Sequence, residues 1–152
     1  MTTCCWFTGK HWNGFIREGV NFYVDRLKPI LPVQIDFLKE GGSGPDALQR
    51  ESEQILKRLQ PGDMVILLDE AGKSMDSRGF ATYLDNWRQR SPKRLIFILG
   101  GAYGFSQDIR DRAAGLLSLS PMTFNHQLAR IVFLEQLYRG MTILNGHPYH
   151  HD

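Results

Sequence analysis

The sequence is poor in cysteine and has no long hydrophobic run. Its only two cysteines, Cys4 and Cys5, are adjacent in a chain of 152 residues. Neighbouring residues of a strand point to opposite faces, so a framework of structural disulfides is excluded and a reducing, cytoplasmic compartment is expected. Apolar runs such as residues 65–68 and 131–134 are far shorter than the roughly 20 residues of a membrane-spanning helix. The first ten residues show no basic segment followed by an apolar one, so neither a secretory signal nor a membrane contact is expected.

The sequence has no large excess of charge of either sign. The chain has 18 Lys and Arg residues against 16 Asp and Glu residues, a formal net charge of +2. This imbalance is too small to indicate nucleic-acid binding by itself, so any RNA-binding surface must be local or assembled from two subunits. Hydrophobic residues make up 42% of the chain, near the globular average. With no repeat or long linker, residues 1–152 are expected to form a single domain.

Apolar periodicity predicts alternating strands and helices. Strands are expected at residues 2–8, 33–38, 64–68, 94–99 and 116–120, and helices at residues 13–27, 47–59, 77–90, after Ser106, and from Asn125 to about residue 140. Residues 64–68 are continuously apolar, as in a strand buried on both faces of a parallel sheet. The strand–helix order predicts an α/β fold with a mostly parallel sheet flanked by helices.

The last predicted helix is apolar on nearly all sides. Its apolar residues are spread over much more than one stripe, and such a helix must be buried on most of its circumference. Two arrangements satisfy this requirement. The helix is either central within one monomer, or it packs against a second copy of the chain, and the pattern favours a homodimer.

Two glycine-containing segments invite comparison with nucleotide-binding loops. Gly72-Lys73-Ser74 lacks the glycine five residues earlier that a phosphate-binding loop requires, because Leu67 stands there. Gly72 is therefore expected to form a turn after the strand. The second segment, from Gly100 to Gly104, directly follows a predicted strand, where glycines let the backbone approach a ligand. Its spacing is not that of the dinucleotide-binding fingerprint.

The C-terminal segment is rich in histidine. His147, His150, His151 and Asp152 lie within six residues, but metal ligands need a rigid frame, and the sequence offers no partner at a recognisable spacing. A metal site is therefore not expected. The remaining alternatives are an unstructured tail, or a tail that docks into a site and supplies Tyr149 and His150.

Three further charged positions leave alternatives open. Glu135 lies within the apolar last helix and needs a partner, either Arg139 at i+4 or Arg130. Asp69-Glu70 could serve acid–base chemistry or simply be solvated in a turn. His126 is either a ligand or a partly buried histidine.

Four segments, in their order and spacing, resemble a known family. They are Leu67-Leu68-Asp69-Glu70-Ala71-Gly72-Lys73; Ile98-Leu99-Gly100-Gly101-Ala102-Tyr103-Gly104; residues 117–124 with His126-Gln127; and Glu135-Gln136-Leu137-Tyr138-Arg139 with His147-Pro148-Tyr149-His150. Together they resemble the RlmH family, SPOUT-class methyltransferases that modify N3 of a pseudouridine in 23S rRNA. The resemblance extends over essentially the whole chain and is strongest from Leu67 onward. The Cys4-Cys5-Trp6 start and the short, glycine-rich segment 41–45 depart from the family pattern.

The resemblance implies a fold, a cofactor and partners. It implies a C-terminal trefoil knot, a homodimer, S-adenosylmethionine as methyl donor, and 23S rRNA in the assembled ribosome as substrate. Carried over by position, the cofactor-binding residues are Leu68, Gly100, Gly101, Leu119, Ser120, Pro121, Met122, Thr123 and Phe124.

The resemblance also implies catalytic roles near the C-terminus. Methylation requires loss of the N3 proton, for which His150 or Tyr149 is the candidate base, while Arg139 could stabilise the resulting anion. A non-catalytic α/β module that binds S-adenosylmethionine or a nucleotide is the alternative function.

Overall fold

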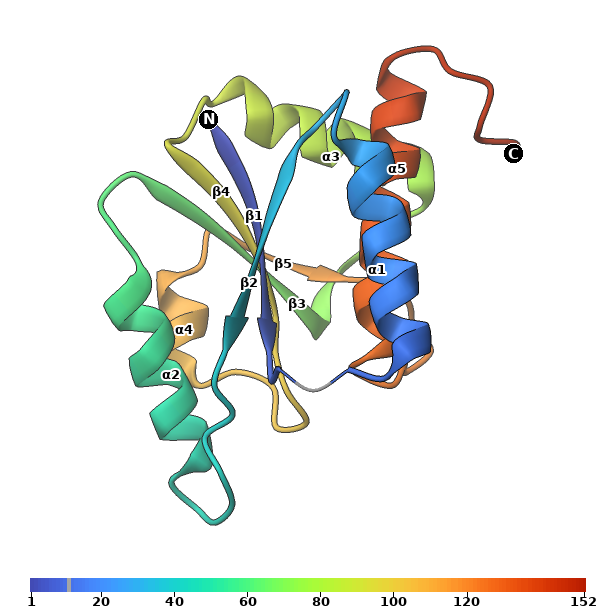
Figure 1. Ribbon diagram of the computed structural model, residues 1–152. Coiled ribbons are helices and arrows are strands. Elements are labelled where there is room, and N and C mark those ends of the chain that lie inside the picture. The colour runs from blue at the N-terminus through green and yellow to red at the C-terminus, as the bar shows by residue number, and fades with distance from the viewer. Residues whose placement is uncertain (11) are drawn as a thin grey trace.

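The protein folds into one five-stranded sheet with helices on both faces (Figure 1). This computed structural model describes residues 1–10 and 12–152. The elements follow in the order β1 (Thr2–Thr8), α1 (Gly14–Leu27), β2 (Val33–Leu38), α2 (Ala47–Arg58), β3 (Asp63–Ser74), α3 (Ser77–Gln89), β4 (Arg94–Leu99), α4 (Gln107–Arg112), β5 (Gly115–Ser118) and α5 (Leu128–Leu144). The strand order is β2-β1-β4-β3-β5, and every pairing is parallel. The predicted α/β fold is thereby confirmed; the knot stays a prediction.

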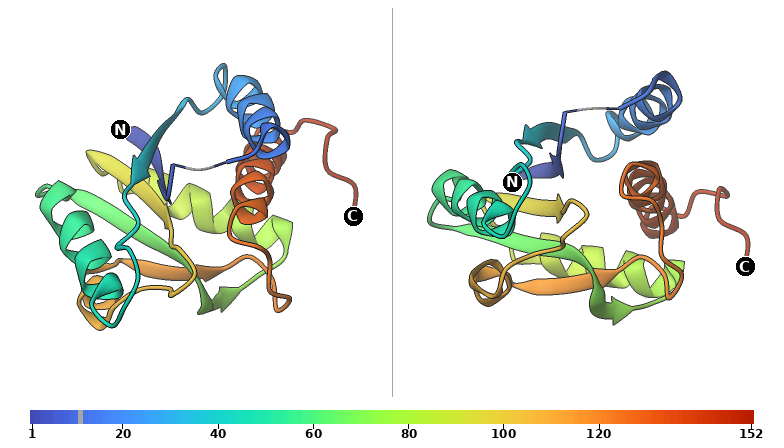
Figure 2. Two further views of the ribbon diagram at one scale, coloured as in Figure 1. Left: turned by 60° about the horizontal axis from the view of Figure 1, so that its bottom comes forward. Right: turned by 90° about the horizontal axis from the view of Figure 1, so that it is seen from below.

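The sheet separates two hydrophobic layers (Figure 2). One layer joins α1, α3 and α5 to one face, with Phe97 and Phe133 in ring contact at 4.9 Å. The other layer joins α2 and α4 to the opposite face through Ile55 and Ile109. Cys4 belongs to this second layer and Cys5 to the first, and both thiols are free. Their opposite orientation follows from the two-residue period of the strand.

Strand β3 differs from its predicted length. It continues past Leu68 to Ser74, with a register shift against β5 between Leu68 and Lys73. The expectation that Gly72 forms a turn is therefore wrong. A Cβ atom at Gly72 would lie 2.6 Å from the backbone of Leu116 and Leu117, so glycine is needed because the two strands approach closely.

Helix α5 also differs from its predicted bounds. It begins at Leu128 rather than just after Asn125, and it runs to Leu144. The Asn125 side chain nevertheless accepts hydrogen bonds from the backbone N–H groups of Gln127 at 2.8 Å and Leu128 at 3.4 Å. One face of α5 is buried on the sheet, whereas Ile131, Val132 and Tyr138 are only half-buried. No helix in the described part of the chain has the length and apolar content to cross a bilayer.

Candidate active site

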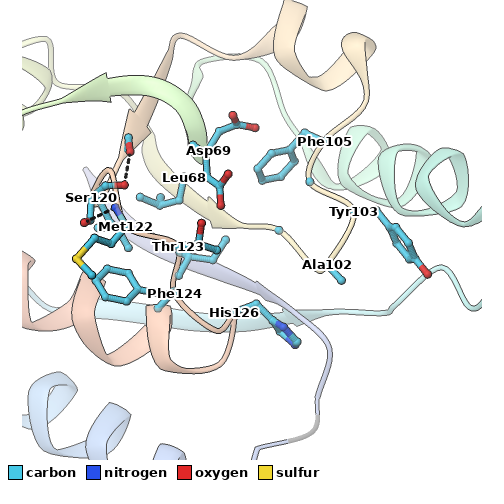
Figure 3. Close-up of a pocket in the computed structure, with 18 of the residues that line it drawn as sticks. Leu68, Asp69, Ala102, Tyr103, Phe105, Ser120, Met122, Thr123, Phe124 and His126 are labelled. Carbon is cyan, nitrogen blue, oxygen red and sulfur yellow. Dashed lines mark hydrogen bonds between the residues drawn. The ribbon is translucent and has the colours of Figure 1, made fainter.

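A pocket of about 380 Å³ opens at the carboxyl edge of the sheet (Figure 3). Three segments surround it: residues 68–70 of β3, the loop 99–105 after β4, and the segment from Ser118 to Ala129, which leads from β5 into α5. The carboxyl ends of parallel strands are the usual position of ligand sites in α/β folds. Here the ends of β3, β4 and β5 provide three backbone segments and a wall of mixed polar and apolar side chains.

The residues that the resemblance assigned to the cofactor come together in this pocket. Eight of the nine line it: Leu68, Gly100, Gly101, Leu119, Ser120, Met122, Thr123 and Phe124. The ninth, Pro121, is exposed and does not line the pocket. Figure 3 shows Met122, Thr123 and Phe124 on one side of the space, opposite Leu68 and Phe105.

The glycine loop after β4 forms a tight wall of the pocket. The Gly104 N–H donates to the Gly101 carbonyl at 3.2 Å, and Gly104 has a φ of +72°. A Cβ atom on Gly100 would lie 3.0 Å from the Phe105 ring and 3.3 Å from the Gly104 carbonyl. Glycine at position 100 therefore lets the chain reverse closely and leaves backbone groups accessible to a ligand.

Two local hydrogen bonds hold the opposite wall of the pocket. The Ser118 hydroxyl donates to the Ser120 carbonyl at 3.1 Å, and the Ser120 hydroxyl accepts from the Met122 N–H at 2.9 Å. These bonds order a segment that belongs to neither a helix nor a strand. Met122 is 77% exposed at the mouth of the pocket, although it is apolar.

One ion pair lies at the pocket floor. Arg110 donates to Asp69 at 2.7 Å, and the other Asp69 oxygen accepts from the Ala71 N–H at 2.8 Å. Asp69 is thus engaged on both oxygens, which favours a structural role over acid–base chemistry. Glu70 is exposed at the rim, and His126 lies on the pocket wall.

The three predicted catalytic residues also come together, but away from the pocket. Arg139 donates to Glu135 at 2.6 and 2.9 Å, and the Tyr149 hydroxyl donates to the same Glu135 oxygen at 3.1 Å. Arg139 Nη1 lies 3.0 Å from His150 Nδ1, and His150 Nε2 lies 2.9 Å from Asp152. Glu135 is therefore paired with Arg139, as one of the two sequence interpretations predicted. The tail is docked rather than unstructured.

The hydrogen-bond partners define the protonation states in the tail. Arginine only donates, so His150 Nδ1 accepts, and Nε2 carries the proton that is donated to Asp152. Burial, together with the negative charge of Glu135, raises the pKa of Tyr149 to about 12. The Tyr149 hydroxyl consequently stays protonated at neutral pH, which favours His150 over Tyr149 as the base.

The tail lies far from the pocket of the same subunit. Neither Arg139, Tyr149 nor His150 lines the pocket, whereas Ala129 at the start of α5 does. Ten residues of helix separate Ala129 from Arg139, which corresponds to about 15 Å along the axis. Figure 1 shows the tail at the opposite end of α5. A single chain thus holds the two halves of the predicted site apart.

Comparison with known proteins identifies the family. The family model described as "Predicted SPOUT methyltransferase" matches residues 1–150. The chain belongs to the SPOUT methyltransferase family. Ribosomal RNA large subunit methyltransferase H of Parabacteroides distasonis is 44% identical over 149 residues, which cover 95% of each chain. The protein of the same name from Trichlorobacter lovleyi is 43% identical over 145 residues, covering 94% of this chain and 95% of the relative.

A solved structure supports the fold of this SPOUT methyltransferase. A probable methylase family protein from Haemophilus influenzae matches with a TM-score of 0.55 at 12% identity. The match covers 95% of this chain but only 66% of that protein, just under two thirds. At this identity the similarity bears on the fold alone. Membership of a methyltransferase family implies that a methyl donor must bind.

Sequence reasoning missed part of this methyltransferase's pocket. Tyr103 lies in the glycine segment 100–104 that was singled out, and Phe105 directly follows it, so their proximity to a ligand could have been inferred. Arg110 gave no local signal, because its role depends on the approach of α4 to the end of β3. No group of three or more metal-ligating side chains is found among the described residues.

Proposed function

We propose that this SPOUT methyltransferase transfers a methyl group from S-adenosylmethionine to N3 of a pseudouridine in large-subunit rRNA within the assembled ribosome. The observation that carries the proposal is the convergence of eight residues, chosen from the sequence alone, on one pocket. Two full-length relatives named for rRNA large subunit methylation support the substrate class. Action on ribosomes implies a cytoplasmic location.

The pocket has the chemistry that S-adenosylmethionine requires. Leu68, Leu119 and Phe124 offer apolar surface for an adenine ring, and the backbone around Gly100 offers polar groups at close range. When bound, the cofactor supplies the methyl group from its sulfonium. The chain then positions the nucleophile in line with that methyl group and excludes water.

The tail residues supply the proton chemistry. Hydrogen bonding to Glu135 raises the pKa of Arg139, so this side chain is a permanent cation that can stabilise the N3 anion. His150 Nδ1 can accept the N3 proton once the substrate displaces its contact with Arg139. Tyr149 orients Glu135 through its hydroxyl.

These residues act in the pocket of a second copy of the chain. The half-buried apolar side chains of α5, including Val132, provide a surface for such a copy, so a homodimer is part of the proposal. If two α5 helices pack antiparallel, the tail end of each lies beside the pocket end of the other. The roughly 15 Å between Ala129 and Arg139 within one helix is then bridged between subunits.

The decisive experiment follows labelled methyl transfer from S-adenosylmethionine to ribosomes that carry unmethylated pseudouridine, with free 23S rRNA alongside. Label on intact ribosomes at N3 is the expected result. The absence of label on either substrate, despite measurable cofactor binding, would support the non-catalytic module instead. Gly100→Val should abolish cofactor binding because its side chain meets the Phe105 ring, whereas Pro121→Ala should bind normally.

Mixing two inactive variants tests the shared site. A chain truncated after Gly146 keeps its pocket but lacks the tail, and Gly100→Val keeps its tail but lacks the pocket. Mixed dimers should regain up to half the activity of a native dimer, because one complete site forms in each. Full activity of the truncated chain alone would rule out a role for the tail.

A further inference from the structure

The amino edge of the sheet, opposite the pocket, carries a concentrated positive charge. Residues 57–63, 88–94 and 112 meet there, because they end α2, α3 and α4 and begin β3 and β4. They contain seven basic residues, Lys57, Arg58, Arg88, Arg90, Lys93, Arg94 and Arg112, and a single acidic one, Asp63. We refer to these seven residues as the amino-edge basic patch.

Contacts across the edge bring the patch residues together. Arg94 donates to the Arg58 carbonyl at 3.1 Å, which joins the end of α2 to the start of β4. The Thr2 N–H donates to the Lys93 carbonyl at 3.0 Å. A Cβ atom at Gly62 would lie 3.4 Å from the Lys93 side chain, so the turns before β3 and β4 are also adjacent.

Most of the patch charge is not neutralised within the chain. The Asp63 carboxylate forms an ion pair with Arg94 at 2.7 Å, and the Arg88 guanidinium lies 4.0 Å from the Asp85 carboxylate. The other five basic residues form no ion pair with a carboxylate of the described residues, and Lys57, Arg58, Arg90 and Lys93 are exposed. Arg90 stacks on Trp87 at 4.7 Å, which presents its guanidinium at the surface.

The distribution of charge in the whole chain makes this patch distinctive. Seven of the 18 basic residues and one of the 16 acidic residues lie in these segments, which leaves 11 basic against 15 acidic residues elsewhere. These segments, Asp63 included, thus have a formal charge of +6, and the remainder of the molecule has −4. A net charge of only +2 therefore conceals a strongly polarised surface, which steers an anionic partner to one end of the molecule.

We propose that the amino-edge basic patch binds backbone phosphates of rRNA at a place separate from the methylated nucleotide. The inference rests on the proposed function for the nature of the partner. Strand β4 joins the pocket edge to the patch, and its six residues span about 20 Å. Phosphates contacted by the patch therefore belong to another part of the folded rRNA. Simultaneous contact at both edges selects the assembled shape rather than a local sequence.

Paired substitutions at two exposed patch positions test the proposal. Arg58→Gln with Lys93→Gln removes two charges without touching the Arg94–Asp63 pair. Arg58→Lys with Lys93→Arg keeps both charges and is the matched control. The glutamine pair should raise the KM for ribosomes about three- to tenfold, and should reduce the salt slope of binding by about 0.7–0.9 per lost phosphate contact. Affinity for S-adenosylmethionine and kcat should not change.

Ribosome co-sedimentation separates failure of this inference from failure of the proposed function. Absence of methyl transfer by the unaltered protein overturns the proposed function, yet the salt-dependent binding of ribosomes can still be compared among variants. Equal ribosome binding and equal salt slopes for the glutamine pair and its control would refute the proposed binding of rRNA phosphates by the amino-edge basic patch. A binding loss with no change in the salt slope would also overturn it, because the loss of phosphate contacts must lower that slope.

Discussion

Replacing Arg130 by methionine should destabilise the protein strongly, although Arg130 touches no carboxylate. Its guanidinium is 1% exposed, and Nη2 donates to the carbonyls of Thr8 and Gly9 at 2.8 Å each. It also lies over the rings of Phe7 at 5.0 Å and Phe37 at 5.9 Å. The side chain therefore ties the start of α5 to the end of β1 through a buried, unpaired cation.

The magnitude follows from two opposing contributions. Two hydrogen bonds from a charged donor contribute about 1.5–3 kcal/mol each, and their loss leaves two carbonyls without a donor. Burial lowers the pKa of Arg130, which reflects the cost of desolvating the cation; Arg130 Nη1 has no partner. Methionine removes that cost and fills much of the volume. We expect a net loss of about 2–4 kcal/mol, equivalent to roughly 5–15 °C in Tm for a domain of this size.

Thermal unfolding at one fixed protein concentration measures the effect, because the proposed dimer would make Tm depend on concentration. Arg130→Lys should lose less than Arg130→Met, since its ammonium can still donate to the Thr8 or Gly9 carbonyl, and Arg17→Met on the exposed side of α1 should change Tm little. The neighbouring Ala129 lines the pocket, so cofactor affinity should fall together with stability. An Arg130→Met variant as stable as the unaltered protein would refute the reasoning.

Three further substitutions test other contacts. Gly72→Ala should cost about 1–3 kcal/mol in urea unfolding, because the new methyl group lies 2.6 Å from the β5 backbone. For Asp63, burial raises the pKa, but hydrogen bonds from Arg94 and the Gln60 N–H more than offset it, so the net pKa is lowered. Asp63→Asn should therefore be less stable at pH 7, and the difference should vanish as pH falls below about 4; equal stability at both pH values would contradict this. Tyr149 in the folded protein should ionise only near pH 12, against about 10 when unfolded, so tail docking is lost as pH rises between these values; a tyrosinate absorbance step at that pH should be missing in Tyr149→Phe.

Periodicity predicted most elements because each satisfies a local rule. The bounds of β1, β2 and β4 agree with the predicted ranges, and the Asn13 and Ser106 side chains cap α1 and α4. Failures occurred where long-range packing decides. Gly72 has the composition of a turn, yet its missing side chain serves the approach of β5, and β5 is not adjacent in sequence.

The candidate site divides in the same way. Pocket residues could be assigned because the family resemblance preserves their order, and parallel strands bring their carboxyl ends to one edge. Pro121 does not line the pocket, although its neighbours Ser120 and Met122 do. Neither the Arg110–Asp69 ion pair nor the amino-edge basic patch could be predicted, since each arises from segments that only the folded chain brings together.

Helix α5 explains why so small an enzyme would need a second copy of itself. Its start borders the pocket, its middle carries Glu135 and Arg139, and its end leads into the tail that carries His150. Arg139, which contacts His150 at 3.0 Å, lies about 15 Å along α5 from Ala129, so no rotamer change within one chain brings the two ends together. Packing against an antiparallel copy solves this geometric problem and buries the half-exposed apolar side chains of α5 at the same time. The same apolar surface therefore both stabilises the proposed dimer and completes its active sites.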